Sequence, residues 1–134
     1  MFTHTRSIFL KETDATGVIY FTSLFHYALE AFEVLLSKKE SSLSQIFASG
    51  YLMPIVHAEA DYKAPLRVGD LISIDLSLGH VGTTSFSIES KIVQLSTNKE
   101  AGRVKLVHAF IKQGEEKASE IPVGILGLLK KDFS

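Results

Sequence analysis

The fold is decided by the stretch TDATGVIYFTSLFHYALEAFEVLLS, which covers residues 13–37. Its second part predicts a helix over residues 20–37, because apolar side chains recur there every three or four positions. They are Phe21, Leu24, Phe25, Ala28, Leu29, Phe32, Leu35 and Leu36. A helix with so broad an apolar face has to be buried against other elements of the fold.

The first part of the stretch places Asp14 and the flexible Gly17 ahead of this helix. A helix N-terminus carries unpaired backbone N–H groups and the positive end of the helix dipole. A carboxylate beside such donors can act as a base or a nucleophile while the donors stabilise an oxyanion. The same pattern also suits a structural role, with Asp14 as a cap or turn residue and Gly17 in a tight bend. The residues alone leave both interpretations open.

Strand-like alternation dominates the rest of the chain. The predicted strands cover residues 3–10, 55–62, 71–78, 84–95 and 103–112, with an exposed turn at 96–102. A short helix is predicted at 43–49 after a polar break at 38–42, with Ser41 or Ser42 as its cap. The apolar residues 123–129 predict a short helix or a packed tail.

This order of elements favours an α+β fold of one domain over residues 1–134, with an antiparallel sheet wrapped around one long central helix. Such a sheet has two edge strands whose backbone groups need covering. Pairing of two subunits edge to edge would cover them, so we expect a homodimer, or a homotetramer built from dimers.

Composition excludes several classes of protein. Lys and Arg number 14 against 15 Asp and Glu, and no basic cluster stands out, so nucleic acid is not an expected partner. The absence of cysteine excludes disulfides and thiolate chemistry. No apolar segment has the length of a membrane span or signal sequence, which predicts a cytoplasmic protein. The five histidines lack the spacing of a metal motif, so we expect no metal.

Two segments carry a family resemblance: Asp14-Ala15-Thr16-Gly17-Val18-Ile19-Tyr20-Phe21 and Tyr62-Lys63-Ala64-Pro65-Leu66-Arg67-Val68-Gly69-Asp70. With the helix between them, they resemble the hotdog-fold acyl-CoA thioesterases of the 4-hydroxybenzoyl-CoA thioesterase family. The resemblance implies an acyl-CoA substrate and no cofactor, since CoA is part of the substrate. It implies that the carboxylate of Asp14 attacks the thioester or activates water, in a loop shaped by Gly17. It also implies that the backbone N–H of Phe21 polarises the thioester carbonyl.

Several side chains are expected to bind the substrate. Some short-chain members of the family carry a histidine where this chain has Phe21, which favours the aromatic-acyl branch. Walls of an acyl pocket are predicted at Tyr20, Leu24 and Phe25, and CoA contacts at Lys63, Arg67, Thr83 and Thr84. His57 would orient the acyl group across a dimer interface. For His57, a partly exposed strand position bonded to a neighbour is at least as simple an interpretation. For the CoA set, a solvated surface role is the simpler interpretation.

Three alternatives remain within the same fold. A short- or medium-chain acyl-CoA or acyl-carrier-protein thioesterase is one, and a non-catalytic ligand-binding dimer is another. The acid at position 14 argues against the second, because an uncharged thioester gives a binding pocket little use for a carboxylate. A dehydratase would need a His and acid pair at the helix start. His26 and Glu30, expected to contact each other at i,i+4, lie well past it.

Overall fold

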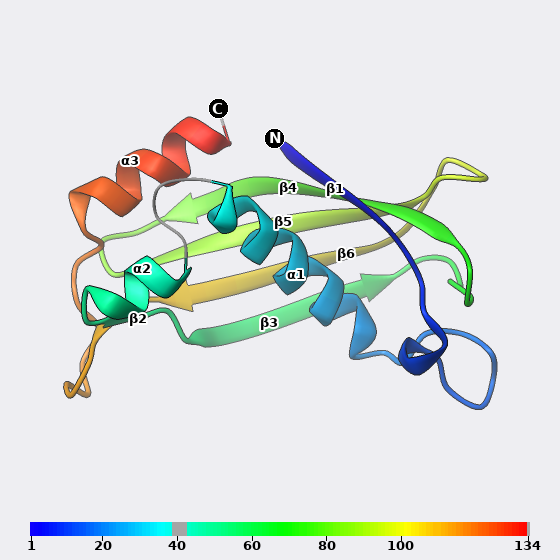
Figure 1. Ribbon diagram of the computed structural model, residues 1–134, viewed down its shortest axis with the longest axis horizontal. Helices are drawn as coiled ribbons and strands as arrows, with labels where there is room; N and C mark the ends of the chain where they lie inside the picture. Colours follow the sequence, from blue (N-terminus) through cyan, green and yellow to red (C-terminus); the bar gives the residue numbers. More distant parts are fainter. Residues whose placement is uncertain (39–42, 134) are drawn as a thin grey trace.

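The computed structural model describes residues 1–38 and 43–133 and has two layers, with the long helix α1 lying across one face of an antiparallel sheet (Figure 1). The strands of the sheet follow the order β1-β4-β5-β6-β3. Their bounds are Phe2–Ser7 (β1), Ile55–Tyr62 (β3), Leu71–Val81 (β4), Ser85–Gln94 (β5) and Lys99–Ala109 (β6). The predicted α+β architecture is therefore confirmed. Residues 39–42 of the predicted polar break, with the two serines proposed as caps, lie outside the described residues.

Helix α1 spans Ser23–Ser37 and begins three residues later than the periodicity predicts. The reason is a tertiary contact: the N–H of Tyr20 bonds to the carbonyl of Glu12 at 3.0 Å, which keeps Tyr20 in the preceding turn. The side chain of Phe21 consequently lies outside the helix and is 70% exposed. The buried face of the helix consists of Ser23, Leu24, Tyr27, Ala28, Ala31, Phe32, Leu35 and Leu36.

The face of the sheet that meets α1 supplies the other half of the core. Alternation predicts that Ile72, Ile74 and Leu76 share one face of β4, and all three are fully buried. The neighbouring strands β5 and β6 add inward side chains at matching register positions: Phe86, Ile88 and Ile92 on β5, and Val104, Leu106 and His108 on β6. This packing places most of the apolar core between the sheet and the helix.

Several predicted boundaries are wrong. The chain from Leu10 to Glu12 leaves the first strand and forms a short 3₁₀ helix, η1. Residues 99–102, predicted as part of an exposed turn, belong to β6 instead, and Ala101 is 1% exposed. The shorter turn is possible because Asn98 adopts a positive φ of 57°, a conformation that asparagine tolerates.

A β-bulge changes the faces of β3. Along this strand Ile55 pairs with His108 of β6, but His57 already pairs with the next residue, Val107. The extra residue shifts the alternation, so Ile55 lies on the inner face with His108 while His57 lies on the outer face. Strict strand alternation over residues 55–62 predicts that Ile55 and His57 share a face, and the bulge makes this prediction wrong.

Smaller elements close the end of the sheet opposite the loop that carries Asp14 (Figure 1). They are α2 (Leu43–Ala48), the paired short strands β2 (Tyr51–Leu52) and β7 (Ile111–Lys112), and α3 (Val123–Asp132). Helix α3 confirms the helical alternative for the apolar tail. Across residues 1–38 and 43–133, no helix is both long and apolar enough to cross a membrane.

Candidate active site

The loop that carries Asp14 folds back on itself and is held against the start of α1. Thr13 forms a β-bridge with Ile19, and the N–H of Asp14 bonds to the carbonyl of Val18 at 2.8 Å. Gly17 lies at the tip with a φ of +83°, where any side chain would be strained. Gly17 therefore shapes the loop through a backbone conformation that other residues rarely adopt. The loop is also fixed from outside, because the N–H of Ile19 bonds to the carbonyl of Leu66 at 3.0 Å.

The carboxylate of Asp14 is partly exposed and hydrogen-bonded through one oxygen only. Its Oδ1 accepts bonds from the hydroxyl of Thr16 at 2.5 Å and from the backbone N–H of Thr16 at 2.7 Å. These two donors, the hydroxyl first, lower the pKa of Asp14 below its usual range. Among the described residues, Oδ2 has no hydrogen-bond donor. The site therefore presents an ionised carboxylate with one oxygen available for chemistry.

Phe21 lies in the turn that leads into α1. Its carbonyl accepts a hydrogen bond from the hydroxyl of Tyr62 at the end of β3, while its N–H has no acceptor within residues 1–38 and 43–133. An N–H group without an intramolecular acceptor can donate to a ligand. The fold-back of the loop brings this donor to the same end of the molecule as Asp14.

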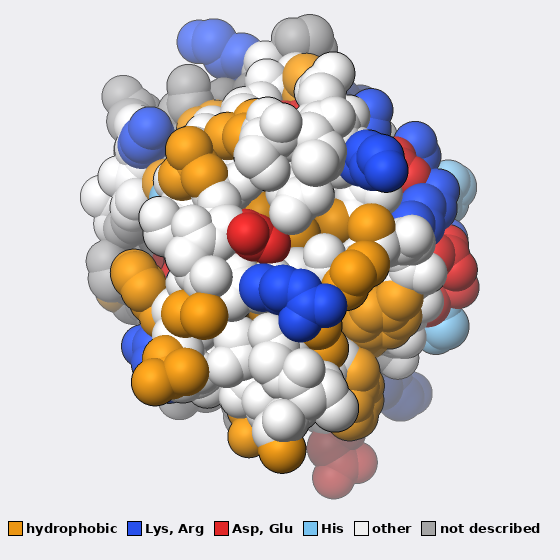
Figure 2. All heavy atoms as spheres, turned by 90° about the vertical axis from the view of Figure 1, so that its right-hand side faces the viewer, with side chains coloured by type: hydrophobic (Ala, Val, Ile, Leu, Met, Phe, Trp, Pro, Cys, Tyr) orange, Lys and Arg blue, Asp and Glu red, His pale blue; other side chains and the backbone are white. Residues whose placement is uncertain are grey.

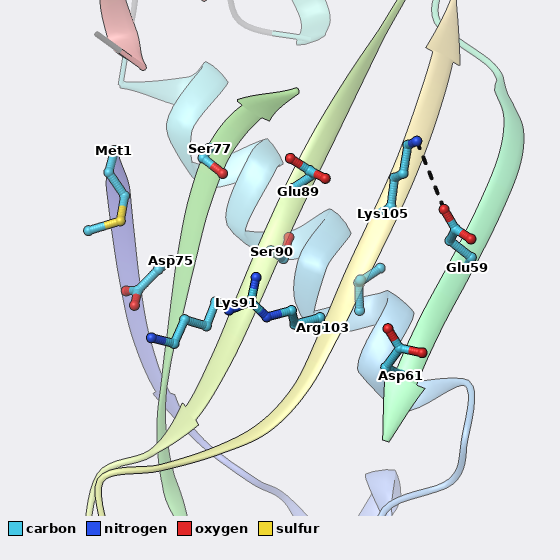
Figure 3. A pocket seen from close by; sticks show the side chains of 11 residues that line it. Met1, Glu59, Asp61, Asp75, Ser77, Glu89, Ser90, Lys91, Arg103 and Lys105 are labelled. Carbon is cyan, nitrogen blue, oxygen red and sulfur yellow. Dashed lines mark ion pairs between the residues drawn. The ribbon is translucent and has the colours of Figure 1, made fainter. Parts of the chain in front are cut away.

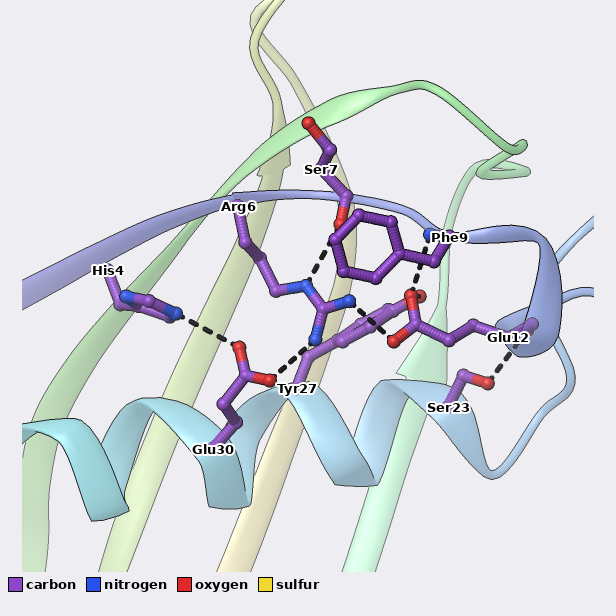
Figure 4. Close-up of polar contacts among 8 residues, drawn as sticks. All are labelled: His4, Arg6, Ser7, Phe9, Glu12, Ser23, Tyr27 and Glu30. Carbon is purple, nitrogen blue, oxygen red and sulfur yellow. Dashed lines mark hydrogen bonds and ion pairs between the residues drawn. The ribbon is translucent and has the colours of Figure 1, made fainter.

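A partly buried ion-pair network anchors the loop to α1 (Figure 4). Arg6 on β1 bonds to Glu12 Oε2 at 2.5 Å and to Glu30 Oε1 of α1 at 2.7 Å. Glu12 Oε1 also accepts from the Phe9 N–H at 2.9 Å and from the Tyr27 hydroxyl at 3.1 Å. This network fixes the position of Glu12, two residues before Asp14, relative to the helix.

The network also shifts the pKa values of Glu12 and Tyr27. Burial raises the pKa of Glu12, but the hydrogen bonds from Phe9 and Arg6 outweigh that effect, and the net pKa is lowered. Burial, followed by the charge of Glu12, raises the pKa of Tyr27. Neither Arg6 nor Glu12 stands out in the sequence, because their contacts with Glu30 and Tyr27 form only when β1 and the loop pack against α1. The network also corrects one prediction: Glu30 pairs with Arg6 and with His4 at 3.0 Å rather than with His26.

Most predicted pocket residues gather at this end of the molecule, whose surface shows hydrophobic side chains around acidic and basic groups (Figure 2). Leu24 and Lys63 line a cavity of about 360 Å³ beside Pro65 and Ala101. Tyr20 lines a second cavity of about 360 Å³ together with His26. Phe25 is half-buried at the margin of the core.

The two predicted cations differ in their surroundings. The amino group of Lys63 forms an ion pair with Glu100. The guanidinium of Arg67 lies against the loop of Asp14, since a Cβ on Gly17 would be 3.6 Å from its Nη1. Of the two, Arg67 is the cation that touches the loop of Asp14.

The remaining predicted residues do not join this site within one protomer. Thr83 and Thr84 lie in the β4–β5 connection, where their carbonyls bond to the N–H groups of Ile121 at 2.9 Å and Phe110 at 3.0 Å. This connection is at the opposite end of the sheet from Asp14 (Figure 1). His57 lies near that same end, on the outer face, with Nε2 3.8 Å from Glu59 Oε1. Contacts of these residues with substrate therefore remain predictions.

The outer face of the sheet carries a different hollow, of about 340 Å³ (Figure 3). Acidic and basic side chains alternate across it, and Nζ of Lys105 lies 3.9 Å from Oε1 of Glu59. Nothing in this hollow resembles the loop of Asp14, and its polar lining suits solvent better than an acyl group. Groups of three or more potential metal ligands are absent from the described part of the chain.

Comparison with known proteins identifies the family. Residues 9–129 match the thioesterase-like superfamily. The chain belongs to this family. It is an acyl-CoA thioesterase of the hotdog fold, as the resemblance implied.

Individual relatives of this thioesterase extend over nearly its whole length. It is 31% identical to the 1,4-dihydroxy-2-naphthoyl-CoA hydrolase of Synechocystis, covering 90% of this chain and 88% of the relative. The enzyme of that name from Nostoc punctiforme is also 31% identical, covering 90% and 83%. The crystal structure of a 1,4-dihydroxy-2-naphthoyl-CoA thioesterase from Synechocystis superposes with a TM-score of 0.90 at 29% identity, over 96% of this chain and 95% of that one.

Proposed function

We propose that this thioesterase hydrolyses an aromatic acyl-CoA, with 1,4-dihydroxy-2-naphthoyl-CoA as the favoured substrate, in phylloquinone or menaquinone biosynthesis. The observation that supports this choice most strongly is the similarity over nine-tenths of the chain to relatives that carry this activity in their names. Phe21, at a position where some short-chain members carry histidine, points the same way. So does the segment Pro54-Ile55-Val56-His57-Ala58, which resembles the 1,4-dihydroxy-2-naphthoyl-CoA hydrolases.

The proposed chemistry uses two groups at the start of α1. The Asp14 carboxylate either attacks the thioester carbon, with release of CoA thiolate and later hydrolysis of the acyl intermediate, or removes a proton from the attacking water. In both cases negative charge develops on the thioester oxygen, and the N–H of Phe21 donates to it. One such donor is worth about 2.7–4 kcal/mol in the transition state.

The enzyme is proposed to act as a homodimer or a tetramer of dimers. Strand β3 is an edge strand, and nearly all of its residues are exposed. An edge strand of this length has unpaired backbone N–H and C=O groups that can pair with another strand. The β3 strand of a second copy can form these hydrogen bonds around a two-fold axis.

A substrate panel tests the assignment. We expect kcat/KM for naphthoyl-CoA thioesters to exceed that for benzoyl thioesters, and both to exceed acetyl- and palmitoyl-CoA, because each good aromatic stacking contact adds up to about tenfold in affinity. Release of free CoA thiol at equal substrate concentrations measures this order. If palmitoyl-CoA or a short aliphatic thioester is hydrolysed fastest, the quinone-pathway assignment is wrong although the enzyme remains a thioesterase.

The ionisation of Asp14 predicts a pH effect. Because the Thr16 hydroxyl lowers the pKa of Asp14, the wild-type carboxylate stays ionised, and active, to lower pH than an ordinary aspartate. Thr16→Val removes that hydroxyl while retaining the backbone N–H donor. The acid limb of the kcat/KM profile should therefore move to higher pH, with little change near neutrality. An acid limb that stays in place, or moves to lower pH, would contradict a role for the Asp14 carboxylate as base or nucleophile.

A further inference from the structure

A separate apolar pocket of about 290 Å³ opens beside the exposed edge of the sheet. Its apolar lining comes from α1, α2, the β2–β3 connection and the start of β3, with Leu29, Phe32, Phe47, Met53 and Ile55. Its volume is at the lower end of the range of about 300–1,000 Å³ for small-molecule sites. The pocket therefore has room for a small ring system but not for a complete acyl-CoA.

His108 supplies the polar group of this pocket. Its side chain is 3% exposed, and its ring stacks on Phe86 with centroids 5.3 Å apart and lies 5.1 Å from the ring of Phe32. Nδ1 is 3.2 Å from the carbonyl of Met53, which can only accept, so Nδ1 carries the hydrogen. Nε2 is then an acceptor, and it is buried without a partner among the described residues.

An unpaired acceptor in an apolar site normally destabilises a protein, so its presence calls for a reason. Burial lowers the pKa of His108 and keeps the ring neutral, which preserves the lone pair on Nε2. The complement of such a group is an O–H donor on an otherwise apolar ligand. Glu33, the only other ionisable residue of the pocket lining, is exposed at the rim and leaves the interior uncharged.

The pocket and Asp14 lie at opposite ends of β3. Ile55 lines the pocket, and Tyr62, at the other end of the strand, bonds to Phe21 beside the catalytic loop. Seven residue steps at about 3.3 Å place these ends about 23 Å apart. This separation is far longer than a two-ring acyl group, so one protomer cannot hold the thioester at Asp14 and the ring in this pocket together.

Antiparallel pairing of β3 with β3 of a second copy removes the separation. A two-fold axis through the middle of the strand places the Ile55 end of one copy beside the Tyr62 end of the other. The pocket of each copy then lies next to the Asp14 loop of its neighbour. In that arrangement, a site that combines Asp14 with His108 takes the two residues from different copies.

We propose that this pocket receives the ring of an aromatic acyl group whose thioester lies at Asp14 of a second copy, and that His108 Nε2 accepts a hydrogen bond from a hydroxyl on that ring. The inference rests on the proposed aromatic acyl-CoA activity and names the residue that selects a hydroxylated ring. A site built to bond a substrate hydroxyl discriminates strongly against the analogue that lacks it.

Two substrates that differ in one hydroxyl test the role of His108. They are 1,4-dihydroxy-2-naphthoyl-CoA, kept free of oxygen, and 1-hydroxy-2-naphthoyl-CoA. The second substrate lacks the hydroxyl at ring position 4, which is remote from the thioester. Wild-type enzyme should prefer the dihydroxy substrate about tenfold in kcat/KM. His108→Asn keeps a donor near Met53 O but removes Nε2, and it should bring this ratio close to one. The ratio is measured within one preparation, so a lower fraction of folded enzyme does not affect it.

The control is Lys105→Asn, which places the same side chain on the outer face of the same strand and should keep the wild-type ratio. A His108→Asn enzyme with the wild-type ratio, or a wild-type enzyme without preference, would overturn the role of His108 while the aromatic thioesterase assignment stands. Failure of the wild-type enzyme to hydrolyse either thioester would overturn the proposed function, and this inference with it.

Mixed dimers test the contribution of the second copy. One differently tagged subunit carries Asp14→Asn and the other His108→Asn, and the dimer is purified through both tags. If the ring enters the neighbour's pocket, one site of each mixed dimer has both Asp14 and His108 intact, and the wild-type substrate preference returns. If both residues serve a site from the same chain, each site lacks one of them and the preference stays lost. The second result, or purification of monomers only, would contradict the shared site.

Discussion

Asp14→Asn is expected to lower kcat for acyl-CoA hydrolysis by about 10²–10⁴-fold, the usual contribution of a general base or nucleophile. The amide retains an oxygen that can accept from the N–H and hydroxyl of Thr16, so the loop should keep its conformation. The negative charge is lost, and with it the ability to attack the thioester or take a proton from water. Steady-state hydrolysis of the best aromatic substrate measures the effect.

Asp61→Asn provides the matched control for Asp14→Asn. Asp61 is an exposed carboxylate on β3, where it lines the polar hollow of the outer face. Its substitution should leave kcat near the wild-type value. If Asp14→Asn folds normally and keeps more than about a tenth of wild-type turnover, well above the expected range, Asp14 is not the catalytic carboxylate.

Phe86→Ala is expected to lower the free energy of unfolding by about 3–5 kcal/mol, the range for truncating a buried phenylalanine. Phe86 is 1% exposed and contacts Phe32, His108 and Phe110, with ring centroids 5.3–5.9 Å apart. Removal of its ring leaves a cavity between α1 and the sheet, which the surrounding aromatic groups cannot fill without moving.

Urea unfolding at a fixed protein concentration measures this loss, because the stability of an oligomer depends on concentration. Phe21→Ala removes the same ring from a side chain that is 70% exposed, and it should change the unfolding free energy by less than about 0.5 kcal/mol. Equal losses in the two variants would show that Phe86 does not pack as described.

The loop of Asp14 and Gly17 shows which features the sequence predicts well. The motif of Asp14 and Gly17 indicated both a reactive carboxylate and a tight turn, and the structure places the two features in one loop. The turn interpretation is confirmed by the bonds from Thr16 to Asp14, whereas the catalytic role stays a prediction. Local sequence is informative here because a turn depends on neighbouring residues and on the positive φ that glycine allows.

Contacts between distant residues are where sequence reasoning failed. The bond from Tyr20 to Glu12 delays the start of α1, and the preference of Glu30 for Arg6 and His4 leaves His26 without its expected partner. Periodicity predicts which side chains share a face, but it does not specify which element will meet that face. The bulge that moves Ile55 to the inner face has the same origin, because it depends on pairing with β6.

The sequence by itself determined the order of the main elements, the α+β class and the family, because these follow from the pattern of neighbouring residues and from a local motif. It predicted only part of the buried face of α1, since Phe21 and Leu29 are exposed while Ser23, Tyr27 and Ala31 are buried. Only the tertiary structure decided how the candidate groups lie relative to one another. It brings Arg6 and Glu12 together beside the loop of Asp14, places His108 in an apolar pocket, and separates that pocket from Asp14 by the length of β3. These relations depend on strand order and register, which arise from packing across the whole chain.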